Sequence, residues 1–178
     1  MSTDTRKVLL RQFDVAWQLA WYHLESLTTE ECLWRPADRG LHVHEAAHHW
    51  VADWPTHEGY DLGPSSAGWI TWHWLFWWRM AADHTWGAAT LTREAVPWPG
   101  HADGLRTELR ALHDAWRAAL ASSDAGTLAS SARVRWPFRD RPLADLFAWA
   151  NTELTKSAAE LGALRFLYAA RRDARASA

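Results

Sequence analysis

Apolar residues recur at steps of three and four along four segments of this 178-residue chain. That spacing places them on one side of an α-helix. The four predicted helices are Thr3–Leu27, a second from Ser65 or Ser66 as N-cap to a stop near Gly87, His101–Ser122, and Asp140 to about Ala170. Four amphipathic helices with little strand signal predict an all-α four-helix bundle.

The apolar stripes of these helices supply the predicted core. It comprises Leu9, Phe13, Trp17, Ala20, Leu24 and Leu27 of the first helix, Leu105, Leu109, Leu112, Trp116 and Leu120 of the third, and Leu143, Leu146, Phe147, Ala150, Leu154, Leu161, Leu164 and Tyr168 of the fourth. We expect residues 1–170 to form a single domain, followed by a disordered tail at residues 171–178.

The connections carry their own patterns. Residues 28–31, TTEE, predict a short helical turn that ends before Pro36. Apolar and polar residues alternate in LHVHEAAHHWVADW, which predicts a β-hairpin that turns between Glu45 and His48. The segment ARVRWPFRDRP, just before the fourth helix, predicts an extended stretch around Val134–Trp136.

Charge and cysteine content narrow the class of protein. The formal net charge is −2, which gives no reason to expect nucleic acid or an anionic membrane as a partner. A single cysteine, Cys32, excludes an internal disulfide and suits a reducing compartment. The opening MSTDTRKVLL has no apolar signal sequence, and the apolar run Ala67–Trp78 is shorter than the ~20 residues that span a bilayer. We therefore expect a cytoplasmic protein.

Tryptophan is unusually frequent, with fifteen in the chain. A buried indole N–H needs a hydrogen-bond acceptor. One interpretation is a bulky core together with a subunit interface. The other is an aromatic-walled pocket around His73, which stands inside the run GWITWHWLFWW of the second helix.

His73 shares a helix face with Ile70, Trp77, Met80 and His84. An imidazole on that face needs a hydrogen bond or a metal, because burying it unsatisfied costs on the order of 1–3 kcal/mol. A structural core histidine and a metal ligand are the two alternatives. At 1.5 Å per residue, His84 lies ~16 Å further along the axis, too far to bind the same ion.

A second metal motif is the string HEAAH, from His44 to His48, which matches the H-E-x-x-H pattern of zinc peptidases. That pattern requires a helix to place both histidines on one face. The alternation on both sides of the string favours strands, so a histidine cluster exposed at a turn is the simpler interpretation.

Three polar residues of the fourth helix, Glu153, Ser157 and Glu160, follow one another at steps of four and three. They line the edge of the face that should meet the other helices. Carboxylates there require an arginine partner, an indole N–H, or a metal shared with His73.

Together, LTTEECLWRP, GWITWHWLFWW and TELTKSAAELGALRFL resemble the DinB-like superfamily of four-helix bundles, in order and spacing over most of the chain. The resemblance implies a divalent metal, zinc or nickel, bound by one histidine of the second helix and an H-x-x-x-H pair on the fourth. In the mycothiol-dependent maleylpyruvate isomerase branch, glutamate replaces the first histidine of that pair.

Matched residue by residue, the resemblance places the metal ligands at His73, Glu153 and Ser157. Serine replaces the usual histidine, and a hydroxyl is a poor zinc ligand. Glu160 and Asn151 are further candidates to bind a cofactor, with Trp77 as part of the cavity wall.

Three functions follow. The first is a metal-dependent S-transferase or isomerase that uses a low-molecular-weight thiol such as bacillithiol, mycothiol or glutathione and acts on a small molecule. The second is a non-catalytic bundle with a degraded metal site, which binds a small molecule or acts through a dimer interface. The third is the H-E-x-x-H zinc peptidase. The resemblance also implies a homodimer.

Overall fold

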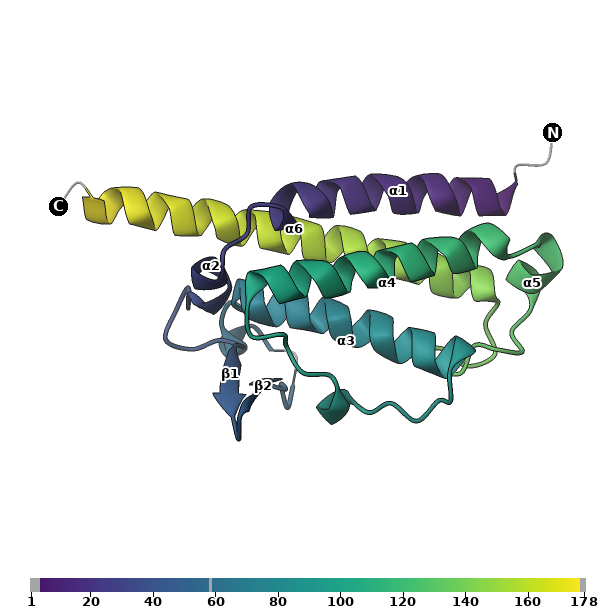
Figure 1. Cartoon of the computed structure of the whole chain (residues 1–178), viewed down its shortest axis with the longest axis horizontal. Coiled ribbons are helices and arrows are strands. Elements are labelled where there is room, and N and C mark those ends of the chain that lie inside the picture. The colour runs from purple at the N-terminus through teal and green to yellow at the C-terminus, as the bar shows by residue number, and fades with distance from the viewer. Residues whose placement is uncertain (1–3, 58, 177–178) are drawn as a thin grey trace.

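The computed structural model describes residues 4–57 and 59–176 and is built mainly from four long α-helices (Figure 1). They are α1 (Thr5–Leu24), α3 (Ala67–Trp86), α4 (Ala102–Ser122) and α6 (Leu143–Ala176). Figure 1 shows α1 and α6 running in one direction and α3 and α4 running in the other. Helices α1 and α3 each pack against both α4 and α6. The predicted all-α four-helix bundle is confirmed.

Side chains at the helix ends explain where two of these helices begin. The Asp4 carboxylate accepts hydrogen bonds from two backbone N–H groups in the first turn of α1. Ser66, one of the two expected caps, accepts a hydrogen bond from the backbone N–H of Trp69 at 3.2 Å and starts α3. Helix α3 ends before Gly87, as predicted.

Two predicted helices have different ends in the structure. Helix α1 stops at Leu24 rather than Leu27, because the chain turns there and the N–H of Leu27 bonds to the carbonyl of Leu24 at 3.1 Å. Helix α6 starts at Leu143 and continues to Ala176. The prediction of disorder is therefore wrong for residues 171–176, where alanine and arginine are strong helix formers. Thr3 and residues 177–178 lie outside the described residues.

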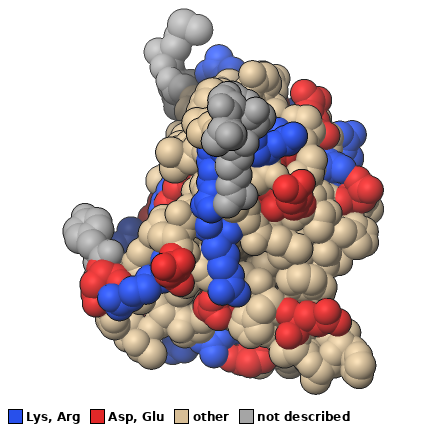
Figure 2. Space-filling view, turned by 90° about the vertical axis from the view of Figure 1, so that its left-hand side faces the viewer, with Lys and Arg blue, Asp and Glu red and all other residues tan. Residues whose placement is uncertain are grey.

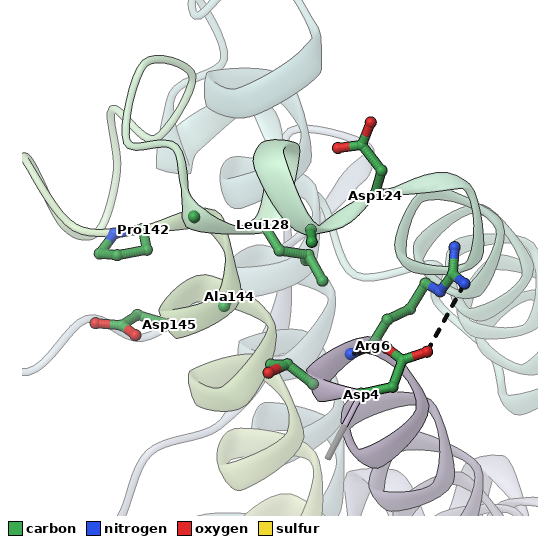
Figure 3. A pocket seen from close by; sticks show the side chains of 10 residues that line it. Asp4, Arg6, Asp124, Leu128, Pro142, Ala144 and Asp145 are labelled. Atoms are coloured by element: carbon green, nitrogen blue, oxygen red, sulfur yellow. Dashed lines mark hydrogen bonds and ion pairs between the residues drawn. The ribbon is translucent and has the colours of Figure 1, made fainter. Parts of the chain in front are cut away.

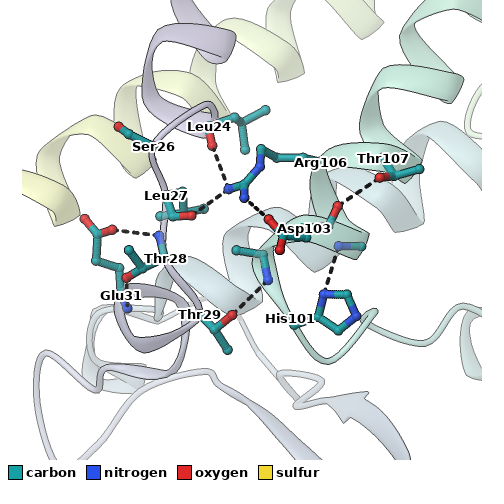
Figure 4. Close-up of polar contacts among 12 residues, drawn as sticks. Leu24, Ser26, Leu27, Thr28, Thr29, Glu31, His101, Asp103, Arg106 and Thr107 are labelled. Carbon is teal, nitrogen blue, oxygen red and sulfur yellow. Dashed lines mark hydrogen bonds and ion pairs between the residues drawn. The ribbon is translucent and has the colours of Figure 1, made fainter.

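The corner after α1 contains the short helix α2 (Thr29–Leu33), in agreement with the predicted turn. Thr28 and Glu31 form a capping box, each side chain accepting from the other residue's backbone N–H at 3.1 and 2.8 Å. From α4, Arg106 donates to the carbonyls of Leu24 and Leu27 (Figure 4). These contacts satisfy backbone groups that the end of a helix leaves unpaired.

The predicted hairpin is confirmed as strands β1 (Val43–Ala46) and β2 (His49–Ala52), which pair antiparallel. Ala47 and His48 form its two-residue turn, with φ angles of 48° and 66°. The hairpin connects α2 to α3 through the 3-10 turn η1 (Tyr60–Leu62).

Long loops link the remaining helices. Helices α3 and α4 are parallel, so the chain must return along the bundle between them, through the 3-10 turn η2 (Arg93–Ala95). Helix α5 (Ala125–Ala129) follows α4. Residues 134–136, expected to be extended, belong to the loop between α5 and α6 and pair with no strand of the described chain.

A single hydrophobic core fills the space between the helices and contains nearly all of the predicted stripe residues. Trp17 and Leu112 are only partly buried at its edge. Several indole N–H groups find backbone or side-chain acceptors, as when Trp72 donates to the carbonyl of Val96 at 2.7 Å. None of the helices that the structure describes is both long enough and apolar enough to cross a membrane.

Candidate functional site

His73 is half-buried on α3, between two tryptophans of the same helix. The Trp69 indole stacks on its ring, with centroids 4.8 Å apart and planes 14° from parallel. The Trp77 Nε1–H donates a hydrogen bond to His73 Nε2. Burial, assisted by the positive charge of Lys156, lowers the pKa of His73 to about 3. The imidazole is therefore neutral at physiological pH, and its Nε2 lone pair is directed at Trp77.

Helix α6 faces this part of α3 in the opposite direction. The rings of Trp77 and Trp149 touch, with centroids 5.1 Å apart. Because the two helices are antiparallel, one turn before Trp77 on α3 lies at the level of one turn after Trp149 on α6. This register places His73 opposite Glu153. By this register the two strongest predicted ligands lie on facing helices, at the same level of the bundle.

Lys156 occupies the same side of α6. Its Nζ lies 3.8 Å from Glu153 Oε2 and 3.5 Å from Glu160 Oε1. The sequence analysis missed this residue, although its spacing of three and four from the two glutamates is a recognisable ion-pair pattern. The carboxylate expected to bind a metal is instead next to an ammonium group.

The other predicted site residues are placed differently. Ser157 is buried at 3% exposure. Glu160 is exposed. Asn151 turns toward α1, where its Nδ2 donates to the carbonyl of Leu9 at 3.1 Å and to Gln12 Oε1 at 3.0 Å. Asn151 therefore does not join His73. Glu153, which faces α3 at the level of His73, is two residues later and lies about 200° around the helix axis from Asn151.

Four half-buried tryptophans surround this region: Trp69, Trp77, Trp136 and Trp149, which we call the aromatic wall. Trp136 stacks on Trp77 with centroids 4.7 Å apart, and it meets Trp149 edge-on at 6.3 Å. Trp136 comes from the loop before α6, so no helical periodicity could have assigned it to this wall. Flat apolar faces next to a lysine and two glutamates suit a small organic ligand.

The HEAAH string does not form a peptidase centre. It lies in β1 and the hairpin turn, where His44 is opposite Val51 in the strand register. His44 Nδ1 lies 3.4 Å from Asp53 Oδ1. The two histidines of the motif are thus not on one face of a helix, and the geometry of a zinc peptidase is absent there.

The residues at His73 do not fit a resident divalent metal. Within the described part of the chain, no three side chains of His, Cys, Asp or Glu come together as a ligand group. His73 Nε2 is engaged by Trp77, and Glu153 is paired with Lys156. A serine hydroxyl contributes little as the third ligand.

The single cysteine is also unsuited to chemistry. Cys32 is fully buried, and burial, together with the charge of Glu31, raises the pKa of its thiol to about 12. A thiol that remains protonated and inaccessible is a poor nucleophile. Any thiol chemistry would need an external thiol.

A model of the DinB superfamily matches residues 12–160, which include all but the start of α1 and the end of α6. The chain belongs to the DinB superfamily. The matched region contains His73, Glu153 and Ser157, so the resemblance seen in the sequence is confirmed at the level of the superfamily. No curated protein and no solved structure gives a significant match.

A cavity lies away from the aromatic wall, at the end of the bundle where α1, α5 and α6 begin (Figure 3). It has a volume of about 660 Å³, and its lining includes Asp4, Arg6, Asp124, Leu128 and Asp145. Asp4 and Asp124 already cap helices α1 and α5. This DinB-superfamily chain therefore has its concentration of aromatic and polar groups at the aromatic wall, not in the cavity at this end of the bundle.

Charged side chains show no single-sign surface on the face that carries the C-terminal end of α6. Figure 2 shows lysine and arginine intermingled with aspartate and glutamate there. The mixture agrees with the small net charge of −2.

Proposed function

We propose that this DinB-superfamily protein binds a small molecule at the aromatic wall without a resident divalent metal. The observation that carries the proposal is Lys156, whose ammonium group lies between Glu153 and Glu160. Its charge also adds to the effect of burial, which is the main cause of the lowered pKa of His73. A positive charge of the protein therefore lies beside Glu153, one of the residues that the family resemblance implies as a metal ligand.

Electrostatics supports this substitution. An ammonium neutralises the carboxylates that would attract a dication, and it repels the dication itself. The imidazole is kept neutral, and its lone pair is held by the Trp77 indole. A metal would have to break both the ion pair and this hydrogen bond before it could bind.

The ligand class follows from the groups present. Half-buried indole faces favour a flat apolar molecule, and Lys156 offers a donor to an anionic or acceptor group on that molecule. His73 and Glu153 would then orient the ligand as polar groups within an apolar surface.

A second candidate is the metal-dependent S-transferase or isomerase, with zinc or nickel and a low-molecular-weight thiol. The position of His73 opposite Glu153 favours it, because two ligands would already be in place. The two candidates differ in whether the purified protein carries metal.

Metal analysis separates the two candidates. Protein purified without chelator or metal resin should contain well below one equivalent of zinc or nickel. Stoichiometric metal that is lost in both His73→Gln and Glu153→Gln would overturn the proposal and favour the transferase. Glu45→Gln is the matched control in the hairpin string and should leave the metal content unchanged.

Zinc titration then tests the part played by Lys156. Ser157→His supplies a third strong ligand but leaves the lysine, so we expect little gain in zinc affinity from it alone. The double variant Lys156→Met, Ser157→His should bind zinc tighter by orders of magnitude, because the ligands are already positioned. An equal gain in Ser157→His alone would show that Lys156 does not occupy the cation position.

Ligand binding can be measured with 8-anilinonaphthalene-1-sulfonate, an aromatic anion, followed by its own fluorescence. Trp136→Ala and Lys156→Gln should each weaken binding several-fold. Trp86→Ala, which removes a tryptophan outside the wall, is the control. An equal loss of probe binding in all three variants would contradict a site at the aromatic wall. So would unchanged binding in all three.

A further inference from the structure

A second pocket lies where α1 ends beside α6 (Figure 1), and it shares none of its described residues with the aromatic wall. Its volume is about 330 Å³, at the lower end of the range for small-molecule sites. Two exposed rings border it, Tyr22 of α1 at 70% exposure and Phe166 of α6 at 76%. Tyr22 contacts the His23 ring edge-on, with centroids 5.2 Å apart, but among the described side chains no ring contact joins it to Phe166. The space between Tyr22 and Phe166 is therefore open to a ligand.

His23 lines this pocket with its ring seated against a glycine of α6. A Cβ atom on Gly162 would lie 2.6 Å from His23 Nε2 and 2.8 Å from His23 Cε1, so only glycine leaves room for the ring in this position. Glycine is less favourable than alanine inside a helix. The close approach of His23 to α6 thus depends on a residue that the helix itself does not favour.

The seated imidazole keeps its hydrogen-bonding capacity. Within the described part of the chain, neither ring nitrogen of His23 makes a hydrogen bond, and neither is fully buried. Burial, assisted by the positive charge of Arg165, lowers the pKa of His23. The ring is therefore neutral at physiological pH and offers a ligand one donor and one acceptor.

The charged groups inside the pocket are already paired. Arg165 Nε donates to Glu31 Oε1 at 2.9 Å. The same guanidinium donates to the carbonyls of His23 and Ser26, at 2.7 and 3.4 Å. Glu25, the remaining charged residue of the described lining, is exposed, so that solvent screens its charge. A charged ligand would compete with the ion pair of Arg165 and Glu31, whereas an uncharged ligand leaves it intact.

We propose that this pocket is a second ligand-binding site, which takes an uncharged planar aromatic molecule that carries hydrogen-bonding groups. The ring of the ligand packs between Tyr22 and Phe166, and its polar groups bond to the imidazole of His23. This site is independent of the function proposed for the aromatic wall.

Three probes that share one ring and differ in charge test the class of ligand. Benzamide is uncharged, benzoate is an anion and benzamidinium is a cation at neutral pH. Nuclear magnetic resonance titrations of the full chain, followed by the imidazole signals of His23, measure their affinities. Benzamide should bind several-fold tighter than either ion. Tighter binding of one of the ions would overturn the proposal, and so would His23 signals that do not respond to benzamide.

The seat of His23 can be removed with a substitution that favours the helix. Gly162→Ala should displace the His23 ring and weaken benzamide binding several-fold. Alanine is the better helix former, so the helical circular dichroism should stay unchanged. Unchanged benzamide affinity in Gly162→Ala would contradict a ligand held by the seated imidazole.

Substitutions of the bordering rings locate the bound probe. Tyr22→Leu and Phe166→Leu remove a ring face but keep an apolar side chain, and each should weaken benzamide binding several-fold. Leu167→Ala is the matched control, because Leu167 is an exposed apolar residue of α6 outside the lining. Trp136→Ala alters the aromatic wall and should leave benzamide binding unchanged. A loss of benzamide binding in Trp136→Ala, with none in Tyr22→Leu and Phe166→Leu, would place the probe at the aromatic wall and overturn the second site.

Discussion

His113 shows how a single side chain can make stability depend on pH. Its ring lies between Phe13 and Trp17, with centroids 5.2 and 4.1 Å away. Nδ1 lies 2.9 Å from Asp114 Oδ1, and Nε2 is buried without a partner among the described residues. Burial lowers the pKa of His113, outweighing the opposite effect of Asp114. The folded protein therefore holds this imidazole neutral.

We predict that His113 contributes to the loss of stability in mild acid. The unfolded chain binds its proton near pH 6.5, but the folded chain binds it only at lower pH. The contribution of the neutral imidazole to the free energy of unfolding is fully present above pH 6.5. Below pH 6.5 it is lost, by at most about 1.4 kcal/mol per pH unit for one group. Urea unfolding from pH 7.5 to 5 should show a shallower pH dependence for His113→Phe than for the wild type. Parallel curves for the two proteins would contradict this.

At the scale of elements, two arginines hold the end of α1. Arg106 reaches it from α4, and Arg165 reaches it from α6. Arg165 donates to the carbonyl of His23 at 2.7 Å and to Glu31 Oε1 at 2.9 Å. Burial raises the pKa of Glu31, but its hydrogen bonds with Thr28 and Arg165 outweigh this and lower it overall. The corner between α1 and α2 is thus fixed by charge-assisted hydrogen bonds from two other helices.

Removing this anchor should be costly. Arg165→Ala removes the charged partner of the mostly buried Glu31 carboxylate and the donor to the His23 carbonyl, so we expect a loss of about 2–4 kcal/mol in the free energy of unfolding. Chemical denaturation followed by circular dichroism measures it. Arg117→Ala breaks a more exposed ion pair with Asp14 and should cost less than about 1 kcal/mol. Similar losses in the two variants would argue against a special role for the corner.

At the scale of the whole molecule, tryptophans link the helices into one core. Trp78 of α3 contacts Phe13 of α1 and Trp116 of α4, with ring centroids 5.6 and 6.1 Å apart. Trp116 in turn meets Phe147 of α6 at 5.7 Å. Each long helix therefore shares buried aromatic contacts with its neighbours, and none has a core of its own.

We accordingly predict cooperative unfolding of the bundle. Tryptophan fluorescence and far-ultraviolet circular dichroism should report the same urea midpoint, because the indoles lose their packing when the helices melt. Trp78→Ala should lower that midpoint in both signals, at a cost of about 3–5 kcal/mol. Two separated transitions in the wild type would instead indicate parts of the bundle that fold independently.

The positions of the helices and of the hairpin can be read from the amino-acid sequence alone. Helix and hairpin positions follow from local causes, namely the period of apolar residues and caps such as Ser66, and these act within a few residues of the chain. The superfamily was also recognisable from the sequence, as the match over residues 12–160 shows. Helix ends also depend on distant contacts, as at Leu24, where a turn held by Arg106 of α4 stops α1.

How these elements meet depends on contacts between residues that are far apart in the chain. Periodicity shows which face of a helix is buried but not which partner that face touches, so Asn151 was assigned to the site although it packs on α1. Trp136 joins the aromatic wall from a loop, through contacts between residues far apart in the sequence. The pairing of Glu153 with Lys156 depends on side-chain conformation beside a buried imidazole, and a pattern of residue types does not contain that information.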